Sequence, residues 1–135
     1  MTVTLVADGT VHALAGTVVG DALVVDADAL ADATDWHLRD EGLCRGDVCI
    51  PRFALAGLER DGGLDLAAFA RALGRPLATE PAAAVAVLAE SPDDQAAAIA
   101  DGQAPPFVLP DLDGNPVALA DFVGRKKLLL AWSSW

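Results

Sequence analysis

The chain contains two cysteines among its 135 residues, and they lie close together. The segment reads Cys44-Arg-Gly-Asp-Val-Cys49, so four residues separate the two, and Gly46 and Asp47 are typical turn formers. A hairpin turning over Arg45–Val48 would set the cysteines opposite each other, with their Cα atoms near the roughly 5.5 Å that a disulfide needs. The spacing therefore favours a structural or redox-active disulfide, and Cys44 and Cys49 are the candidate redox pair.

Two other interpretations of the pair stay open. Cys44 and Cys49 could be inert buried thiols, packed like small apolar side chains. They could also bind a metal such as zinc, with His37 as a third ligand and His12 as a further one. Against this, a zinc knuckle usually has a second ligand pair of regular spacing, and His37 beside Trp36 also fits a surface or half-buried strand.

The charged residues next to the cysteines predict no clear net lowering of a thiol pKa. Arg45 would lower the pKa of a neighbouring thiol, and Asp47 would raise it. The chain has no phosphate-binding glycine loop, no Ser/His/Asp arrangement and no His-Glu-x-x-His motif. Four aspartates between residues 26 and 35 are most simply a solvated helix face, since they lack the spacing of an EF-hand loop. Chemistry in this chain is therefore expected at the two cysteines.

An internal similarity predicts the elements that hold this segment. Val25–Leu38 matches Leu64–Leu77 at a constant offset of 39 positions. In each stretch a short apolar strand meets an aspartate, Asp26 or Asp65, that can cap a helix of about two turns. An extended segment follows in both. We therefore predict a duplicated strand–helix–strand unit.

The surrounding sequence predicts a hairpin and a linker. Val3–Val6 and Val11–Leu14 alternate as strands around a turn at residues 8–10. Val85–Leu88 reads as a strand, and Asp94–Ala100 as a short helix that Ser91 or Asp93 could cap. We expect an α+β module over residues 1–90, a linker with a short helix over 91–102, and a third segment over 103–135.

The third segment has the pattern of an α/β domain. Residues 107–109 and 117–119 read as short strands around a turn at 113–116. Asp121 can cap a helical turn that ends at Gly124. The apolar run Leu128–Trp132 has the length of a strand buried on both faces, as in a central parallel strand.

The third segment also resembles the opening of a redoxin domain. The resemblance rests on Ala-Pro-x-Phe, Leu-x-Asp-x-Asp-Gly, Asp-Phe-x-Gly, a basic pair and Trp-x-x-Trp within residues 103–135. Redoxins include peroxiredoxins of the AhpC/TSA type and TlpA-like thiol–disulfide reductases, and they have the thioredoxin fold. The resemblance implies a reactive cysteine after the central strand, attacking a peroxide or a protein disulfide. That cysteine is expected just beyond Trp135, so the chain is expected to be truncated and non-catalytic by itself.

Residues 1–90 also resemble the stalk-like repeats named after the N-terminal domain of copper amine oxidases, in their overall residue pattern rather than in a defined motif. Those repeats consist of a strand, a helix with an Ala- and Leu-rich face, and a hairpin. The resemblance implies a binding or spacing module rather than a catalyst. It transfers no functional residues to this chain.

The composition and charge of the chain limit the classes of partner that it is expected to bind. The formal net charge is −11 and the pI about 4.2, so phosphate backbones and anionic lipids are repelled. No apolar run approaches the roughly 20 residues of a membrane span. The N-terminus lacks the basic start and apolar core of a secretory signal. We expect a cytoplasmic location, no nucleic-acid partner and no membrane partner.

Taken together, the sequence predicts an α/β protein: an α+β N-terminal module with duplicated strand–helix–strand units, followed by the first strands of a thioredoxin-like fold. The expected function is that of the N-terminal portion of a thiol-dependent, antioxidant oxidoreductase. The expected partners are a peroxide or protein-disulfide substrate and a thiol reductant, with no cofactor. The alternatives are a non-enzymatic binding or scaffolding module stapled by Cys44–Cys49, and a small metal-binding domain using Cys44, Cys49 and His37.

Overall fold

The computed structural model describes residues 1–97, 99–100 and 102–132. The chain divides into two compact units, residues 1–95 and 96–135, and each is described by itself. The division falls within the stretch expected to be a linker. The chain combines helices with a mixed sheet, as expected for an α/β-type protein.

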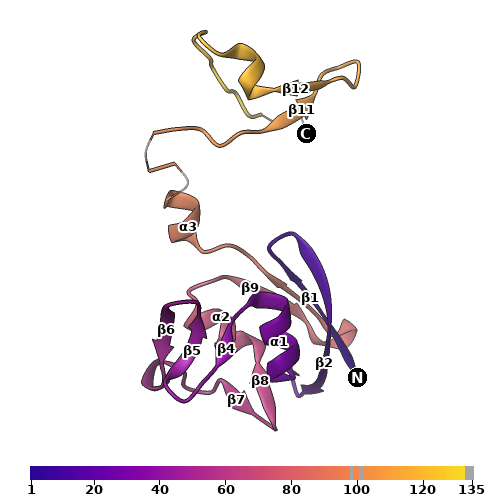
Figure 1. The fold of residues 1–135 in the computed structure, drawn as a ribbon. Coiled ribbons are helices and arrows are strands. Elements are labelled where there is room, and N and C mark those ends of the chain that lie inside the picture. The colour runs from indigo at the N-terminus through magenta and orange to yellow at the C-terminus, as the bar shows by residue number, and fades with distance from the viewer. Residues whose placement is uncertain (98, 101, 133–135) are drawn as a thin grey trace. The chain divides into compact units, whose positions relative to one another are not determined.

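The first unit is organised by a seven-stranded sheet of order β7-β8-β3-β2-β1-β10-β9. The first strand of the unit, β1, and its last strand, β10, are neighbours in this sheet. They pair in parallel, with Thr4 opposite Val85. The other neighbouring strands pair antiparallel. The strands are β1 (Thr2–Ala7), β2 (Thr10–Val19), β3 (Ala22–Val25), β7 (Glu59–Arg60), β8 (Gly63–Asp65), β9 (Leu77–Glu80) and β10 (Val85–Leu88) (Figure 1).

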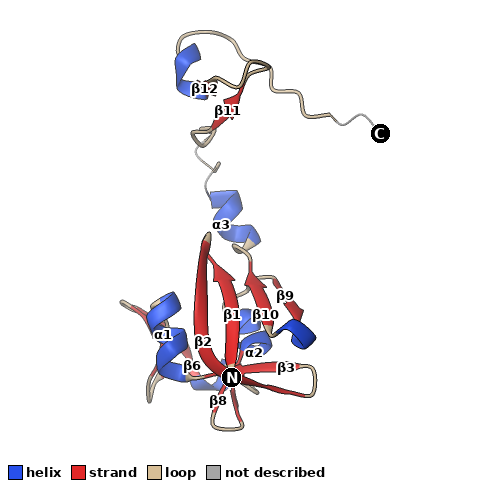
Figure 2. Cartoon of the chain, turned by 90° about the vertical axis from the view of Figure 1, so that its right-hand side faces the viewer, coloured by secondary structure: helices blue, strands red, loops and turns tan. Residues whose placement is uncertain are grey.

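The β1–β2 hairpin is confirmed, and Figure 2 shows it as a long two-stranded ribbon. Asp8 and Gly9 form its loop with φ of 50° and 75°. Two consecutive positive φ values are what a type I′ turn requires. Val3 and Leu5, on one face of β1, are fully buried, so the alternation along β1 places that face in the core.

Both predicted helix starts are confirmed. Helix α1 (Ala27–Thr34) begins after Asp26, and α2 (Leu66–Ala72) begins after Asp65, 39 positions later. Each aspartate accepts hydrogen bonds from the two backbone N–H groups of the first helical turn that need a partner, at 2.9–3.1 Å. Strands β3 and β8, which precede these helices, pair with each other, so the two similar segments lie side by side in one sheet.

A second, three-stranded sheet follows α1 (Figure 1). It consists of β4 (His37–Leu38), β5 (Gly42–Arg45) and β6 (Val48–Pro51), in that order. Leu38, Leu43 and Ile50 are opposite one another across the three strands and pack on the core of the first unit. The 3₁₀ turn η1 (Arg52–Ala54) leads from this sheet back to β7.

Arg75 ties the end of α2 to the end of the large sheet. Its guanidinium donates to the carbonyl oxygens of Ala89 and Leu88 at 2.6 and 3.3 Å and to Asp8 Oδ1 at 2.7 Å. The Arg75 side chain is 10% exposed, whereas the side chain of its partner Asp8 is 58% exposed. Strand β9 then runs into η2 (Pro81–Ala83) and β10, the strand that was predicted at Val85–Leu88.

Helix α3 (Pro92–Ala97) contains the division between the two units. It starts two residues before the predicted helix, and its Asp94 N–H donates to Ser91 Oγ at 3.0 Å. Strands β11 (Val108–Pro110) and β12 (Pro116–Ala118) form a hairpin followed by η3 (Leu119–Phe122). Asp121 lies inside η3 and accepts from Ala118 N, rather than capping a turn from outside. Hydrogen bonds from the backbone and side chain of Asn115 hold the pKa of Asp111, in the hairpin turn, below its usual range.

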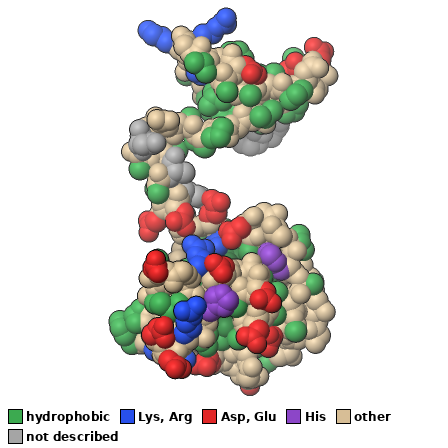
Figure 3. All heavy atoms as spheres, viewed as in Figure 1, with side chains coloured by type: hydrophobic (Ala, Val, Ile, Leu, Met, Phe, Trp, Pro, Cys, Tyr) green, Lys and Arg blue, Asp and Glu red, His purple; other side chains and the backbone are tan. Residues whose placement is uncertain are grey.

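The central strand expected at Leu128–Trp132 is not formed. This run has no regular secondary structure, and Leu128 is 93% exposed. The physical reason is that an apolar strand buried on both faces needs neighbouring strands and covering helices, and the described part of this unit supplies a two-stranded hairpin only. Figure 3 shows hydrophobic side chains on the surface of this unit, and more acidic than basic side chains on the visible face of the first. Among the described residues, no helix combines the length and apolar character that crossing a bilayer requires.

We predict that the two helix caps differ in their contribution to stability. Asp65→Ala removes two cap hydrogen bonds and the ion pair with Arg60 at 3.3 Å from a site that is 7% exposed. It should lower the free energy of unfolding by about 2–3 kcal/mol, against about 1 kcal/mol for Asp26→Ala at the exposed cap. Urea unfolding followed by circular dichroism measures both, and equal losses would contradict this assignment.

We also predict that the apolar run of the second unit governs dye binding and solubility. The double variant Leu128→Glu, Leu130→Glu should lower the fluorescence of a hydrophobic surface dye at least about twofold and raise the solubility limit. Val11→Glu, at an isolated exposed position on β2, is the matched control and should change neither. Unchanged dye binding in the double variant would show that this run is covered in solution.

Candidate thiol site

Cys44 on β5 and Cys49 on β6 are directly opposite each other and form a disulfide. Their Cα atoms are 4.1 Å apart, close to the roughly 4.5 Å of a non-hydrogen-bonded antiparallel pair. Gly46 and Asp47 form the two-residue loop between Arg45 and Val48, and Gly46 has a φ of 56°. A glycine with positive φ at the first loop position is typical of a type II′ hairpin, which matches the twist of the strands. Local turn chemistry thus brings the sulfurs together.

The two cysteines differ sharply in exposure. Cys44 lies on the central strand of the small sheet and is 1% exposed, whereas Cys49 lies on the edge strand β6 and is exposed. An approaching thiolate must contact the sulfur that it attacks. Cys49 is therefore the sulfur that a thiol in solution can reach.

His37, the predicted third ligand, is opposite Cys44 in the pairing of β4 with β5. Its Nε2 lies 3.5 Å from Asp35 Oδ1, and its side chain is 46% exposed. His12 lies on β2 in the large sheet, paired with Leu5. Within the described ranges, the structure instead groups Glu41 with the two cysteines: one carboxylate oxygen and both sulfurs lie within 4.8 Å of one another.

Glu41 was missed from the sequence, although a signal for it exists. It lies in the tight turn between β4 and β5, where Arg39 and Gly42 exchange backbone hydrogen bonds of 2.7 and 3.2 Å. A hairpin on each side of β5 puts both of its turns next to the disulfide. Recognising the second hairpin in Leu38–Gly42 would have pointed to Glu41.

The electrostatic role expected for Arg45 is not what the structure shows. The Arg45 guanidinium stacks on the Trp36 ring, with 5.0 Å from Cζ to the ring centroid. Successive side chains on a strand point to opposite faces, so Arg45 lies on the face of β5 opposite to Cys44. A cation–π contact of this kind contributes about 0.5–1 kcal/mol at an exposed site. Arg45 therefore anchors the small sheet on Trp36 instead of facing the sulfurs.

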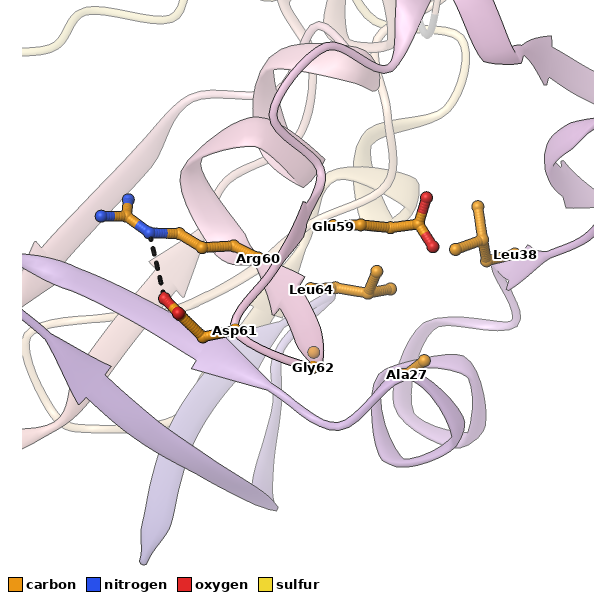
Figure 4. A pocket seen from close by; sticks show the side chains of 8 residues that line it. Ala27, Leu38, Glu59, Arg60, Asp61, Gly62 and Leu64 are labelled. Carbon is orange, nitrogen blue, oxygen red and sulfur yellow. Dashed lines mark ion pairs between the residues drawn. The ribbon is translucent and has the colours of Figure 1, made fainter.

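A hollow of about 350 Å³ elsewhere in the first unit offers no comparable chemistry (Figure 4). Glu59, Arg60 and Asp61 line it together with apolar residues. The charges are already paired: Glu59 with Arg52 at 2.8 Å, and Arg60 with both Asp61 and Asp65 at 3.5 and 3.3 Å. These pairs fix the turn between β7 and β8.

We predict a strong asymmetry in thiol reactivity. In Cys44→Ser the remaining Cys49 thiol should react with an aromatic disulfide reagent at least about tenfold faster than Cys44 does in Cys49→Ser, because access limits the reaction. Stopped-flow absorbance measures both rates. The same variants unfolded in denaturant are the control and should react at similar rates, and equal rates in the folded variants would contradict the assignment of Cys49 as the accessible sulfur.

The disulfide and its neighbours thus define the candidate site, with Cys49 outside, Cys44 inside and Glu41 within reach of both sulfurs. Its chemistry can be compared with that of known proteins only through its residues and geometry. No family model, no curated protein and no solved structure matches this chain.

Proposed function

We propose that this chain is the N-terminal part of a thiol-dependent oxidoreductase of the redoxin type, and that its own contribution is thiol–disulfide exchange at Cys44–Cys49. The observation that carries the proposal is the asymmetry of the disulfide, with an exposed Cys49 and a buried Cys44. An exchanging pair needs one sulfur that meets the partner and a second that is shielded from it and can release the partner.

The exchange proceeds in two steps. A thiolate of a dithiol partner attacks Cys49 Sγ, the Cys44–Cys49 bond breaks, and its electron pair passes to Cys44 Sγ, which takes up a proton. The second thiol of the partner then attacks the partner's own sulfur in the mixed disulfide and releases Cys49. The partner becomes a disulfide and the chain a dithiol. In the reverse reaction the Cys49 thiolate attacks a protein disulfide, and Cys44 then attacks Cys49 in the mixed disulfide, which releases the protein as a dithiol and restores the Cys44–Cys49 bond.

The size of the closed loop argues against a purely stabilising role. Cys44 and Cys49 are five positions apart, and closing so short a loop is worth about 2 kcal/mol, against more than 4 kcal/mol for a loop of about 100 residues. The type II′ turn already brings the strands together, which reduces that gain further. The disulfide thus adds little stability to the fold, while its exposed Cys49 is accessible to a thiol partner.

The second unit supports the redoxin assignment through its hairpin and its uncovered apolar run. Strands β11 and β12 lie within one residue of the strands that the residue pattern predicts in the redoxin-like segment. Leu128–Leu130 are each at least 74% exposed, which fits a segment that becomes a core strand only within a larger sheet. On this proposal the first unit, with β3–α1 and β8–α2 as duplicated units, is an appended module that brings its redox pair to a thioredoxin-like domain.

A binding or scaffolding module is the second candidate, and the burial of Cys44 favours it. A sulfur that is 1% exposed on a central strand also fits a permanent crosslink. In that case the disulfide should resist reduction in the folded chain. The reduction potential therefore separates the two functions.

The deciding experiment equilibrates the full chain with dithiol redox buffers of known potential and counts alkylated cysteines by mass spectrometry. We expect a midpoint above about −300 mV. In Cys44→Ser the free Cys49 thiolate should attack the disulfide of an oxidised partner and keep that partner as a mixed disulfide, because no Cys44 thiol is there to release it. Cys49→Ser is the matched control and should trap far less. A midpoint below about −300 mV would assign the disulfide to the scaffolding module instead.

A further inference from the structure

We propose that reduction of Cys44–Cys49 creates a zinc site in which Glu41 is the third protein ligand. The inference rests on the proposed function only in that the disulfide must open while the chain stays folded. It makes the first unit a redox-controlled metal site: closed to metal when oxidised, and able to take one Zn²⁺ when reduced.

The geometry brings three suitable donors together. A Glu41 carboxylate oxygen and the sulfurs of Cys44 and Cys49 lie within 4.8 Å of one another. Zinc takes thiolate sulfur at about 2.3 Å and carboxylate oxygen at about 2.0–2.2 Å, so donors around one ion are themselves about 3–4 Å apart. Once the sulfurs are no longer bonded, side-chain rotation suffices to separate them around an ion, and a water molecule can take the fourth position.

Glu41 has no competing partner in the described part of the chain. Its carboxylate forms no hydrogen bond and no ion pair there, in contrast to Glu59, which is bonded to Arg52 at 2.8 Å. Asp35 is likewise paired with His37. Glu41 is therefore an acidic side chain near the sulfurs that can bind a cation without giving up an existing contact.

The turn that carries Glu41 is held independently of the disulfide. Arg52 donates from Nη2 to the carbonyl oxygen of Arg39 at 2.9 Å and from Nε to that of Asp40 at 3.4 Å. Backbone hydrogen bonds between Arg39 and Gly42 close the same turn. Opening the disulfide thus leaves Glu41 in place, and a site whose ligands are already positioned loses less entropy on binding.

Electrostatic charge couples reduction of the disulfide to Zn²⁺ binding. Two thiolates and a carboxylate place three negative charges together, which is unfavourable without a cation, whereas Zn²⁺ neutralises most of that charge. Reduction by a phosphine consumes one water and yields the phosphine oxide and two thiols, and Zn²⁺ then displaces two protons. Because linkage is reciprocal, Zn²⁺ must favour the reduced form by the same factor as reduction favours Zn²⁺.

The test uses the full chain and Zn²⁺ alone. After reduction with a water-soluble phosphine, competition with a chromogenic chelator should show one Zn²⁺ per chain, and the oxidised chain should bind none. Co²⁺ in place of Zn²⁺ should give the intense absorption of tetrahedral thiolate coordination. Glu41→Gln should weaken Zn²⁺ binding at least about tenfold, since even indirect partners of a metal ligand are worth that much.

Asp47→Asn is the matched control, because it removes one negative charge from the turn between the cysteines without touching the ligand group. It should leave Zn²⁺ affinity within about twofold. Equal weakening by both variants, or unchanged binding in Glu41→Gln, would overturn the role of Glu41.

Thiol counting after phosphine treatment distinguishes the failures. If two thiols appear in the folded chain but no Zn²⁺ binds, the metal site is wrong and the exchange function stands. If no thiols appear until the chain is unfolded, both are wrong.

Discussion

The parallel pairing of β1 with β10 is the constraint on which the first unit depends. It joins residues 81 positions apart, Thr4 and Val85, and it gives β1, whose Val3 and Leu5 are fully buried, a neighbouring strand on each side. Closing a chain segment of that length costs on the order of 4 kcal/mol of conformational entropy. Burial of apolar side chains on the strands that the pairing brings together must offset this cost. Arg75 adds an ion pair to Asp8 at the end of the sheet. Everything between β2 and β9, including the small sheet with its disulfide, lies within the segment that this pairing closes.

The core contact and the disulfide lie on opposite faces of β5. On β5, Leu43 is fully buried against the core of the first unit, whereas Cys44, the next residue, lies on the other face of the same strand. Opening the disulfide therefore removes a crosslink from the face of β5 opposite to Leu43 and leaves the apolar contacts of Leu43 intact. A redox change at the sulfurs can thus occur without unfolding the sheet that holds them, which is what both reversible exchange and metal uptake require.

Local patterns were readable from the sequence, and long-range ones were not. The aspartate caps, the β1–β2 hairpin, the strand at Val85–Leu88 and the apposition of the two cysteines all depend on residues within a few positions of one another. The parallel pairing of β1 with β10 and the adjacency of β3 and β8 depend on which faces fit together, and neither leaves a local signal. Trp36 over Arg45 and Glu41 beside the sulfurs both follow from the β4–β5 register, which two-residue strand pairing makes hard to foresee. The strand expected at Leu128–Trp132 fails for the opposite reason: its local pattern is strong, but a buried strand exists only with neighbours.

The position of Arg45 determines what kind of thiol pair this is. Redox-active cysteines that act as strong nucleophiles usually have a cation or a helix N-terminus next to the sulfur. Here the nearest arginine in sequence is stacked on Trp36 across the strand, and the charged group grouped with the sulfurs is the carboxylate of Glu41. A carboxylate disfavours a further negative charge on a nearby sulfur. On the proposed function, such a pair suits accepting electrons from a partner that supplies the nucleophile. On the proposed function, the attacking thiolate belongs to the partner, and Cys44–Cys49 is the disulfide that it opens.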